Sequence, residues 1–331
     1  MRGAGVRFRQ YGVSGVLSIA VLALASAQRP SRADSYPTQD IHVIGSFPAG
    51  SGADLIVRYF ADKLRVLSGR TTIVENKVGA SGNIATQYVA RAKPDGYTVL
   101  IGAGSGVAAA MHLFKRPPVD ALKELQVVAT INQLAFMVVV PAQSPYRTLA
   151  ELTEGLKKKG GKASYAQSNT TGKVTGELYK AAGGLNAVDI PYRTANDSVN
   201  DFATGALDFG VLDAQFAMSQ SREGRLRILA VNTPERMQTA PDIPTLKELG
   251  VPVEMRNWFA AIVPAGTPRP VVDQLNKWIN EIEATDETRK FLNSFASDPF
   301  ISTVDEAQKL LASDIKDWAM FVSAANIPKQ D

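Results

Sequence analysis

A glycine-rich turn near the start of the chain has the residue types that hold an anion. Residues 47–54, with the sequence FPAGSGAD, lie between a strand-like run and a helical pattern. Glycines let a backbone turn tightly, and the first N–H groups of a helix are unpaired and lie at the positive end of its dipole. The turn is therefore a candidate cradle for a carboxylate or a phosphate. A helix-capping turn explains the same spacing equally well, and a P-loop is excluded because no Gly-Lys-Ser/Thr follows.

Two further polar turns stand at the starts of predicted helices. Residues 102–106 (GAGSG) lack the third glycine of the dinucleotide-binding fingerprint, and no acidic residue ends a strand about 20 residues later. A Rossmann cofactor site is therefore not expected. Residues 167–172 (QSNTTG) open a helix in the second half of the chain. They form a helix-capping cluster, a second wall of the anion site, or both.

The residues needed for catalysis are scarce. The chain has no cysteine, which excludes thiol nucleophiles, cysteine-ligated metals and disulfides, and it has only two histidines. Ser51 lies in G-S-G, which lacks the G-x-S-x-G elbow, and no Asp–His pair can be assigned to it. His112 lies in an apolar helical stretch, which favours packing, and Asp213 follows a strand, where it either lines a site or caps a helix. We therefore expect no enzymatic activity, no cofactor and no metal.

The first residues predict a cleaved export signal. Three arginines among them form a positive end, residues 13–25 are a short apolar run, and the small residues of a cleavage site end at Ala27. A second such site ends at Ala33. The run is shorter than the roughly 20 apolar residues of a membrane anchor. We expect a signal peptide of residues 1–27, with Ala33 as the alternative end, and no lipid anchor because that would need a cysteine.

The basic charge of the chain belongs largely to this leader. Of 36 basic and 32 acidic residues, three arginines and no acid lie before residue 28, so the remainder is close to neutral. The basic run Lys157–Lys159 precedes two glycines and is explained as the solvated end of a helix, where cations suit the helix dipole. The sequence therefore does not predict binding to nucleic acid.

The elements that must position these turns alternate between β-rich runs and amphipathic helical patterns. The predicted strands span 41–47, 71–74, 97–103, 163–166, 188–192, 207–212 and 226–232. Alternation of this kind predicts largely parallel sheets with helices on both faces. Three further helical patterns end the chain.

Two long β-rich runs, 126–141 and 253–263, join the two α/β sets. We predict an α/β protein of two domains joined by crossing β-strands, with a binding cleft between them. Domain 1 is formed by residues 34–135 plus 256–331, and domain 2 by residues 136–255.

A series of short motifs occurs in order along almost the whole mature chain. These are YP (36–37), FPAGSGAD (47–54), VENKVGASGN (74–83), PDGYT (94–98), VDIPYR (188–193), LRILAV (226–231), WF (258–259) and PAGTP (264–268). The set resembles the Bug family, the periplasmic solute-binding proteins of tripartite tricarboxylate transporters. The resemblance implies a two-lobed type II periplasmic-binding-protein fold that closes over a small organic anion. It implies membrane permease subunits as partners, and we expect the protein to act in the periplasm as a monomer.

The resemblance also implies a set of ligand-binding residues. In the family, the turns that match 47–54 and Ser105 hold a carboxylate, largely through backbone N–H groups and ordered water, while the second lobe selects the rest of the ligand. The residues implied are Phe47, Ala49, Gly50, Ser51, Asp54 and Ser105 in domain 1, and Ser168, Asn169, Thr170, Tyr192, Arg193 and Asp213 in domain 2. A periplasmic sensor for a membrane receptor would use the same pocket, and a secreted enzyme acting on a small acid is the further alternative.

Arg256 departs from the family pattern, which usually has a small polar residue there. It lies in an extended run just before Trp258, and its fork of donors suits a carboxylate. If Arg256 faces the cleft, the ligand is a dicarboxylate or an aromatic acid, with its distal group near Arg256 or Arg193. An ion pair between Arg256 and Glu254 is the alternative. The second-lobe turns at 168–172 and 194–196 also depart from the pattern, so the resemblance does not name the ligand.

Overall fold

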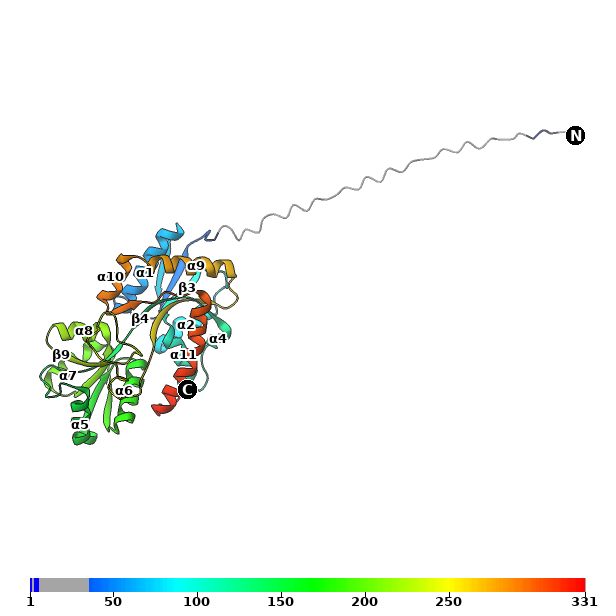
Figure 1. Ribbon diagram of the computed structural model, residues 1–331. Helices are drawn as coiled ribbons and strands as arrows, with labels where there is room; N and C mark the ends of the chain where they lie inside the picture. Colours follow the sequence, from blue (N-terminus) through cyan, green and yellow to red (C-terminus); the bar gives the residue numbers. More distant parts are fainter. Residues whose placement is uncertain (2, 6–35, 331) are drawn as a thin grey trace. The chain divides into compact units, whose positions relative to one another are not determined.

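The computed structural model describes residues 1, 3–5 and 36–330 of the chain. Apart from residues 1 and 3–5, the predicted signal peptide lies outside these residues, as do both predicted cleavage positions. A compact unit begins at Tyr36 and holds two β-sheets with their helices (Figure 1). Within the described residues, no helix has the length and apolar character needed to span a bilayer.

The first sheet is mixed, with a parallel part and an antiparallel part. Its strand order is β11-β4-β10-β3-β1-β2. The strands are β1 (Ile41–Gly45), β2 (Thr72–Asn76), β3 (Thr98–Ala103), β4 (Leu125–Leu134), β10 (Asn257–Pro264) and β11 (Ser297–Pro299). β1 pairs in parallel with β2 and β3, whereas β10 runs antiparallel to both β3 and β4.

Helices cover both faces of this sheet. Val99 and Ile101 of β3 belong to one core cluster and Leu100 belongs to another, as expected for a strand buried on both sides. The first face carries α1 (Gly52–Ser68), α9 (Arg269–Glu283) and α10 (Asp286–Ser294), and the second carries α2 (Asn83–Ala90), α3 (Gly104–Leu113), α4 (Ala121–Glu124) and α11 (Val304–Ala324). A short 3₁₀ turn, η2 (Ala80–Gly82), precedes α2. We call this sheet with its helices lobe 1.

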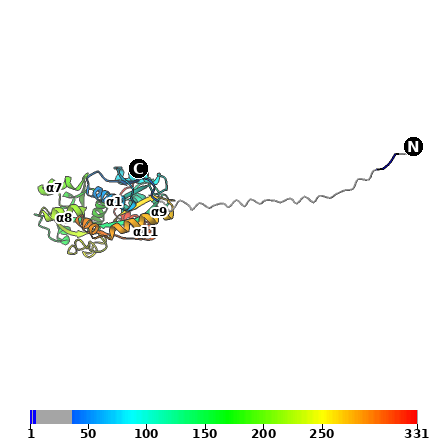
Figure 2. The ribbon, with the colours of Figure 1, turned by 90° about the horizontal axis from the view of Figure 1, so that it is seen from above.

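The second sheet has the order β7-β6-β8-β5-β9. Its strands are β5 (Phe136–Pro141), β6 (Ala163–Gln167), β7 (Ala187–Pro191), β8 (Phe209–Asp213) and β9 (Leu226–Val231), and its helices are α5 (Leu149–Lys159), α6 (Thr170–Gly183), α7 (Val199–Thr204) and α8 (Ala214–Arg222), with 3₁₀ turns η3 (Gly160–Lys162) and η4 (Ala195–Ser198). β6 is parallel to β7 and β8, and β5 is antiparallel to β8 and β9. We call this sheet with its helices lobe 2. Figures 1 and 2 both place α7 and α8 at one end of the unit and α9 at the other.

The two connections between the sheets differ. β4 continues into β5 with only Ala135 between them, as the long run at 126–141 predicts. The second connection is less regular than predicted: β10 begins at Asn257, and residues 251–256 form no strand. Pro252 has no N–H to donate, and the N–H of Val253 donates locally to the carbonyl of Val251. Met255 donates to the carbonyl of Asn232 just after β9, but residues 251–256 form no regular ladder.

Buried amides tie the two connections together. The side-chain oxygen of Asn232 accepts hydrogen bonds from the N–H of Phe136 (2.9 Å) and from Nδ2 of Asn257 (3.2 Å). One hydrophobic core cluster also runs through both lobes, because it contains Trp318 of α11 as well as Tyr179 of α6. The domain boundaries at 135/136 and 255/256 stay predictions, since both sheets belong to one compact unit.

Candidate functional site

The parallel strands of both sheets end on the sides that adjoin the connection between the lobes. Their last residues are Gly45, Asn76 and Ala103 in lobe 1, and Gln167, Pro191 and Asp213 in lobe 2. Asp213 pairs with Phe136, the residue after the crossing point at Ala135, and Ala103 pairs with Phe259 near the start of β10. Ligands of open α/β sheets bind at such carboxyl ends. We call the turns that follow these strands the interlobe site.

The two halves of the interlobe site touch. A Cβ atom built on Gly52, the first residue of α1, would overlap Oε1 of Gln215 from α8. The predicted turn at 47–54 in lobe 1 therefore faces the start of α8 in lobe 2.

The buried carboxylate of Asp54 holds the turn at 47–54 in place through hydrogen bonds. Its side chain is 0% exposed and accepts hydrogen bonds from the Gly50 N–H (2.8 Å), Asn76 Nδ2 (2.6 Å) and Arg58 Nε (2.8 Å). Burial opposes ionisation, but the hydrogen bonds from Arg58, Asn76 and Gly50 outweigh it and hold the pKa of Asp54 below its usual value. Asn76 also donates to the Phe47 carbonyl (3.0 Å). The structure thus places Asp54 as the residue that orders the turn, with its oxygens already occupied.

The first turn of α1 has both an N-cap side chain and backbone N–H groups without an acceptor. Ser51 is the N-cap, and its hydroxyl accepts from the Asp54 N–H (3.2 Å). Its own N–H donates to the carbonyl of Pro48. Among the described residues, the N–H groups of Gly52 and Ala53 have no acceptor. Both explanations of this turn therefore apply, because it caps the helix and still leaves two donors at the positive end of the dipole.

The start of α3 forms the next wall of the site. Ser105 is 4% exposed, and its hydroxyl has no hydrogen-bond partner among the described residues. A Cβ on Gly104 would overlap the ring of Trp258, so only glycine lets this turn pack there. Trp258 is fully buried, and its Nε1 donates to Asp314 Oδ2 (2.9 Å). A buried tryptophan thus fixes the turn that presents Ser105.

In lobe 2, two of the predicted ligand residues cap helices. The Asn169 side chain accepts from the Gly172 N–H (3.0 Å), and Asp213 accepts from the Phe216 N–H (2.9 Å). Of the two roles expected for Asp213, the structure shows the helix cap, and its role as a ligand residue stays a prediction. Burial raises the pKa of the Asp213 carboxyl, although the hydrogen bond from Phe216 opposes this shift.

The other predicted residues of lobe 2 differ in how freely they can reach a ligand. Ser168 and Thr170 are half-buried, and their hydroxyls have no partner within the described chain. The Tyr192 hydroxyl donates to Asp201, and burial raises the pKa of Tyr192 to about 12. Arg193 is exposed and has no acidic partner in the described part of the chain.

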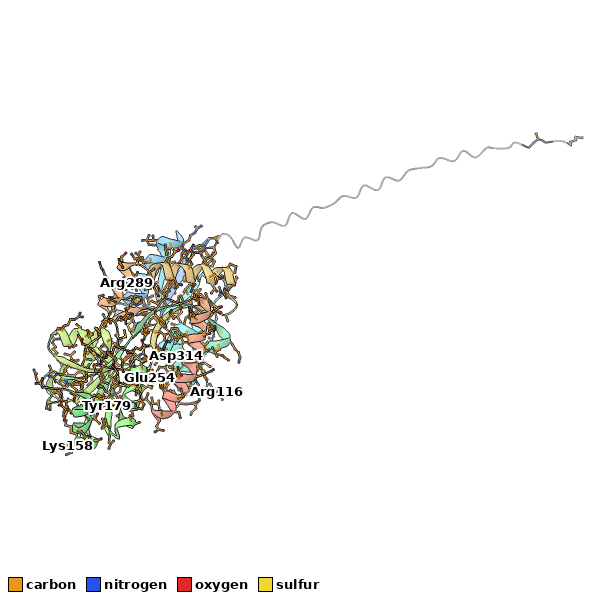
Figure 3. All side chains as sticks on the ribbon, viewed as in Figure 1. Arg116, Lys158, Tyr179, Glu254, Arg289 and Asp314 are labelled. Atoms are coloured by element: carbon orange, nitrogen blue, oxygen red, sulfur yellow. The ribbon has the colours of Figure 1, made fainter. Side chains whose placement is uncertain are left out.

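Arg256 does not form the ion pair with Glu254 that the sequence left open. Glu254 pairs instead with Lys247 (2.8 Å). Arg256 is exposed, and its charge acts on Asp314 of α11, which is labelled in Figure 3. Burial raises the pKa of Asp314 to about 7, while the hydrogen bond from Trp258 and the charge of Arg256 oppose the shift. Whether Arg256 contacts a ligand stays a prediction.

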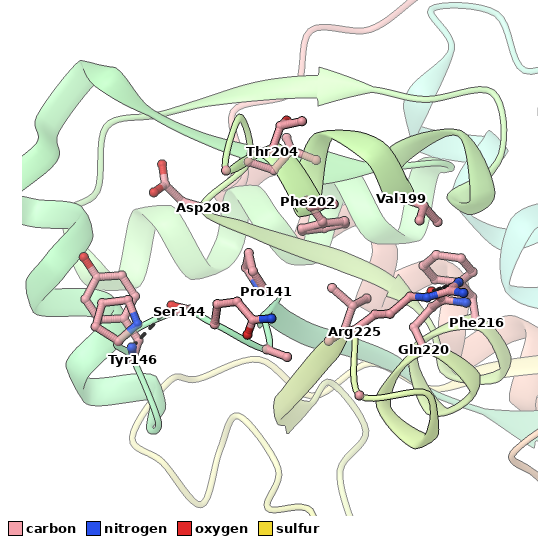
Figure 4. Close-up of a pocket in the computed structure, with 18 of the residues that line it drawn as sticks. Pro141, Ser144, Tyr146, Val199, Phe202, Thr204, Asp208, Phe216, Gln220 and Arg225 are labelled. Atoms are coloured by element: carbon pink, nitrogen blue, oxygen red, sulfur yellow. Dashed lines mark hydrogen bonds between the residues drawn. The ribbon is translucent and has the colours of Figure 1, made fainter.

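A concave pocket of about 570 Å³ lies elsewhere in lobe 2 (Figure 4). Pro141 and Leu226 line it, at the ends of β5 and β9 opposite to the edge at which Asp213 lies. Apolar side chains such as Phe202 and Phe216 form part of its wall (Figure 4). None of the predicted ligand residues lines this pocket, so it is not the interlobe site.

Sequence reasoning missed three residues of the interlobe site. Asn76 ends β2 and joins Asp54 to Phe47. Ser46 follows β1, and its side chain lies against the turns at Gly82 and Gly102. Gln215 follows the cap residue Asp213 by two positions. The rule that ligands bind at the carboxyl ends of parallel strands points to all three, because Asn76 ends β2, Ser46 follows β1 and Gln215 lies in the first turn of the helix after β8.

No metal centre is found where the structure is defined, since no three His, Cys, Asp or Glu side chains gather there. His42 Nδ1 is paired with Glu75 (2.8 Å), and His112 Nε2 is buried without a partner. Neither histidine lies within hydrogen-bond distance of the Ser51 hydroxyl.

Comparison with known proteins gives a consistent result. The model of the tripartite tricarboxylate transporter family receptor (TctC) matches residues 56–327. A UPF0065 protein of Bordetella bronchiseptica is 31% identical over 82% of this chain and 82% of its own length. Protein BugT of Bordetella pertussis is 28% identical over 90% of this chain and 93% of its own. A structure of R. palustris Rpa4515 with adipate superposes with a TM-score of 0.80 at 26% identity, covering 89% of this chain and 100% of that one.

Proposed function

Because the chain belongs to the tripartite tricarboxylate transporter receptor family, the Bug family of periplasmic solute-binding proteins, we propose that it captures a small organic carboxylate in the interlobe site and delivers it to membrane permease subunits. The family and its two-lobed α/β fold confirm the expectations drawn from the sequence. The observation that carries the proposal is the pair of N–H groups on Gly52 and Ala53, which have no acceptor among the described residues, at a turn that Gln215 of the other lobe contacts.

The chemistry of this turn favours a carboxylate held by the backbone. Arg58 is the nearest cation of α1, but it is already bonded to Asp54 and Asn76. An anion at the turn would therefore be held by backbone donors and the positive end of the helix dipole. Ser105, with a free hydroxyl at the start of α3, supplies a further donor.

A second acidic group on the ligand would give Arg193 and Arg256, which are both exposed, a role in binding. Arg193 lies in lobe 2 beside the carboxyl end of β7, and Arg256 lies in the segment that returns to lobe 1. A dicarboxylate or an aromatic acid would place one carboxylate at Gly52 and its distal group toward one of these cations. Adipate, the dicarboxylate in the Rpa4515 structure, is therefore a suitable first probe.

Binding without turnover fits the residues of the site. The Ser51 hydroxyl is used as a helix cap, the nearby Asp54 carboxylate is already bonded to other groups, and neither histidine of the described residues is bonded to Ser51. Calorimetry with adipate, followed by recovery of the adipate, tests the proposal: chemically unchanged adipate supports a binding protein, and a converted product supports a secreted enzyme. Genes for permease subunits next to this one would favour transport over a sensory role.

A thermal-shift screen decides the ligand class. Adipate, hexanoate, a tricarboxylate and an aromatic acid are compared at equal concentrations. A ligand at 100 times its dissociation constant adds about 2.7 kcal/mol to the free energy of unfolding, so a genuine ligand raises Tm by several degrees. No shift with any carboxylate would contradict the proposal.

Export to the periplasm is the expected location for this role. N-terminal sequencing of the mature protein should find a start after Ala27 or after Ala33. An intact Met1 on the soluble protein would contradict the predicted signal peptide.

A further inference from the structure

Gln215 reaches from lobe 2 to the first residue of α1. It is the second residue of α8, and a Cβ built on Gly52 would overlap its Oε1 and lie 2.9 Å from Cδ and 3.1 Å from Nε2. The side-chain amide therefore lies against the Cα of Gly52. Only glycine leaves room for it there.

The amide of Gln215 lies where lobe 1 already offers two donors. Its Oε1 is the atom nearest to Gly52, and a half-turn of the amide brings the donor Nε2 to the same place. Within the described residues, Nε2 of Gln215 has no acceptor, and neither have the N–H groups of Gly52 and Ala53. These donors come from opposite lobes and lie at the positive end of the α1 dipole. A carboxylate has two oxygens and accepts several hydrogen bonds at once.

We propose that Gln215 is a ligand clamp, which donates from lobe 2 to the same carboxylate that the α1 turn holds, and that the absence of a side chain at Gly52 is what lets the amide approach so closely. The assignment of the ligand rests on the proposed function, whereas the contact between Gln215 and Gly52 does not. A neutral amide binds a carboxylate without adding a buried cation, so its loss weakens affinity and leaves the net charge of the site unchanged.

The contact itself is tested without any ligand. The chain has no cysteine, so a variant with Gly52→Cys and Gln215→Cys carries only two thiols. Gln215 makes the contact with the end of its side chain, so the two Cβ atoms lie farther apart than Gly52 and the amide, and a short thiol-reactive cross-linker takes the place of a direct disulfide. We expect this reagent to join the two thiols of the ligand-free protein within one chain, measured by mass spectrometry and by gel mobility.

The matched control pairs Gly52→Cys with Gln220→Cys. Gln220 lies on the same helix but lines the pocket at the far edge of lobe 2 (Figure 4). That pair should not cross-link. Failure of the Gly52–Gln215 pair, or equal cross-linking of the control pair, would overturn the proposed contact.

The role in binding is tested with adipate. Gln215→Ala should weaken adipate binding about 10- to 100-fold, the loss of one hydrogen bond to a charged group, and Gln215→Glu should weaken it further because a second carboxylate repels the first. Gly52→Ala should also weaken binding, since its Cβ takes the place of the amide. Gln220→Ala should bind adipate like the wild type.

The double variant separates a clamp from two independent effects. If Gly52→Ala acts by displacing Gln215, the variant with both Gly52→Ala and Gln215→Ala should bind adipate no more weakly than Gln215→Ala alone. Additive losses, or wild-type affinity for Gln215→Ala, would overturn the clamp. If the wild type bound none of the screened carboxylates, the proposed function and the ligand half of this inference would both fall, and the cross-link would still decide the contact.

Discussion

Lobe 1 and lobe 2 build their halves of the interlobe site from different parts of the chain. In lobe 1 the unpaired donors are backbone N–H groups of Gly52 and Ala53, held in place by a buried, fully bonded Asp54. In lobe 2 the free groups are side chains, such as the Ser168 hydroxyl and the Arg193 guanidinium. Backbone donors do not change when side chains are substituted, whereas side-chain donors do. Under the proposed function, lobe 1 therefore suits the carboxylate that the ligands share, and lobe 2 suits the part that distinguishes one ligand from another.

The largest effect is expected from removing the carboxylate that orders lobe 1. Asp54→Ala leaves Arg58 and Asn76 without their partner and frees the Gly50 turn, so it should lower the free energy of unfolding by about 2 to 3 kcal/mol and abolish adipate binding. Urea unfolding and calorimetry measure the two losses. The control is Asp62→Ala on the same helix, where the exposed pair with Arg65 contributes about 0 to 1 kcal/mol. Equal losses in both variants would contradict the ordering role of Asp54.

The next largest effect tests whether residues outside the α1 turn distinguish a dicarboxylate from a monocarboxylate. If Arg256 holds a distal carboxylate, Arg256→Ala should weaken adipate binding by about 1.5 to 3 kcal/mol and leave hexanoate binding nearly unchanged. Arg193→Ala serves as the paired variant, because Arg193 is the other exposed cation considered for this role. A uniform change for both acids would remove Arg256 from the ligand site.

Two substitutions in the lobe 1 turn compare backbone geometry with a side chain. Gly50 has φ +81°, with nothing within 4 Å of a Cβ at that position, so Gly50→Val strains the backbone without a clash. We expect a cost of about 1 to 3 kcal/mol and a large loss of adipate affinity. Ser51→Ala removes the helix cap and should cost about 1 kcal/mol with a modest loss of affinity. Equal, wild-type-like affinities would place the carboxylate elsewhere.

The smallest expected effect is a difference in how pH changes stability through Asp54 in lobe 1 and Asp213 in lobe 2. Because the pKa of Asp54 is lowered by folding, its contribution to stability is present above its unfolded pKa and is lost as pH falls through the folded pKa. The pKa of Asp213 is raised, so stability is lost as pH rises above its unfolded value. Asp54→Asn should thus lower Tm at pH 7, whereas Asp213→Asn, which still caps α8, should raise Tm slightly. Both differences should shrink toward pH 3; shifts of the same sign would contradict the assigned directions.

Much of the fold follows from local sequence patterns. The strand and helix periodicities predict two α/β sheets, and β4 and β5 follow one another as the long apolar run indicates. The run at 253–263 predicts a strand that is longer than the one formed, since Pro252 and a local hydrogen bond at Val253 keep that segment out of the ladder. Hydrophobicity alone does not report which N–H groups are available for pairing.

Some features of the interlobe site follow from residues close together in the sequence, and others depend on contacts between residues far apart in the chain. The sequence by itself determined the glycine-rich turn at 47–54 that starts a helix, and the capping roles open to Asn169 and Asp213, because glycine spacing and helix-start residues act within a few positions of each other. Only the tertiary structure decided that Asp54 bonds to Asn76, that Glu254 pairs with Lys247 instead of Arg256, and that Gln215 of one lobe lies on Gly52 of the other. These contacts join residues whose separation along the chain no periodicity encodes. They depend on how the two sheets are brought together at the crossing through Ala135.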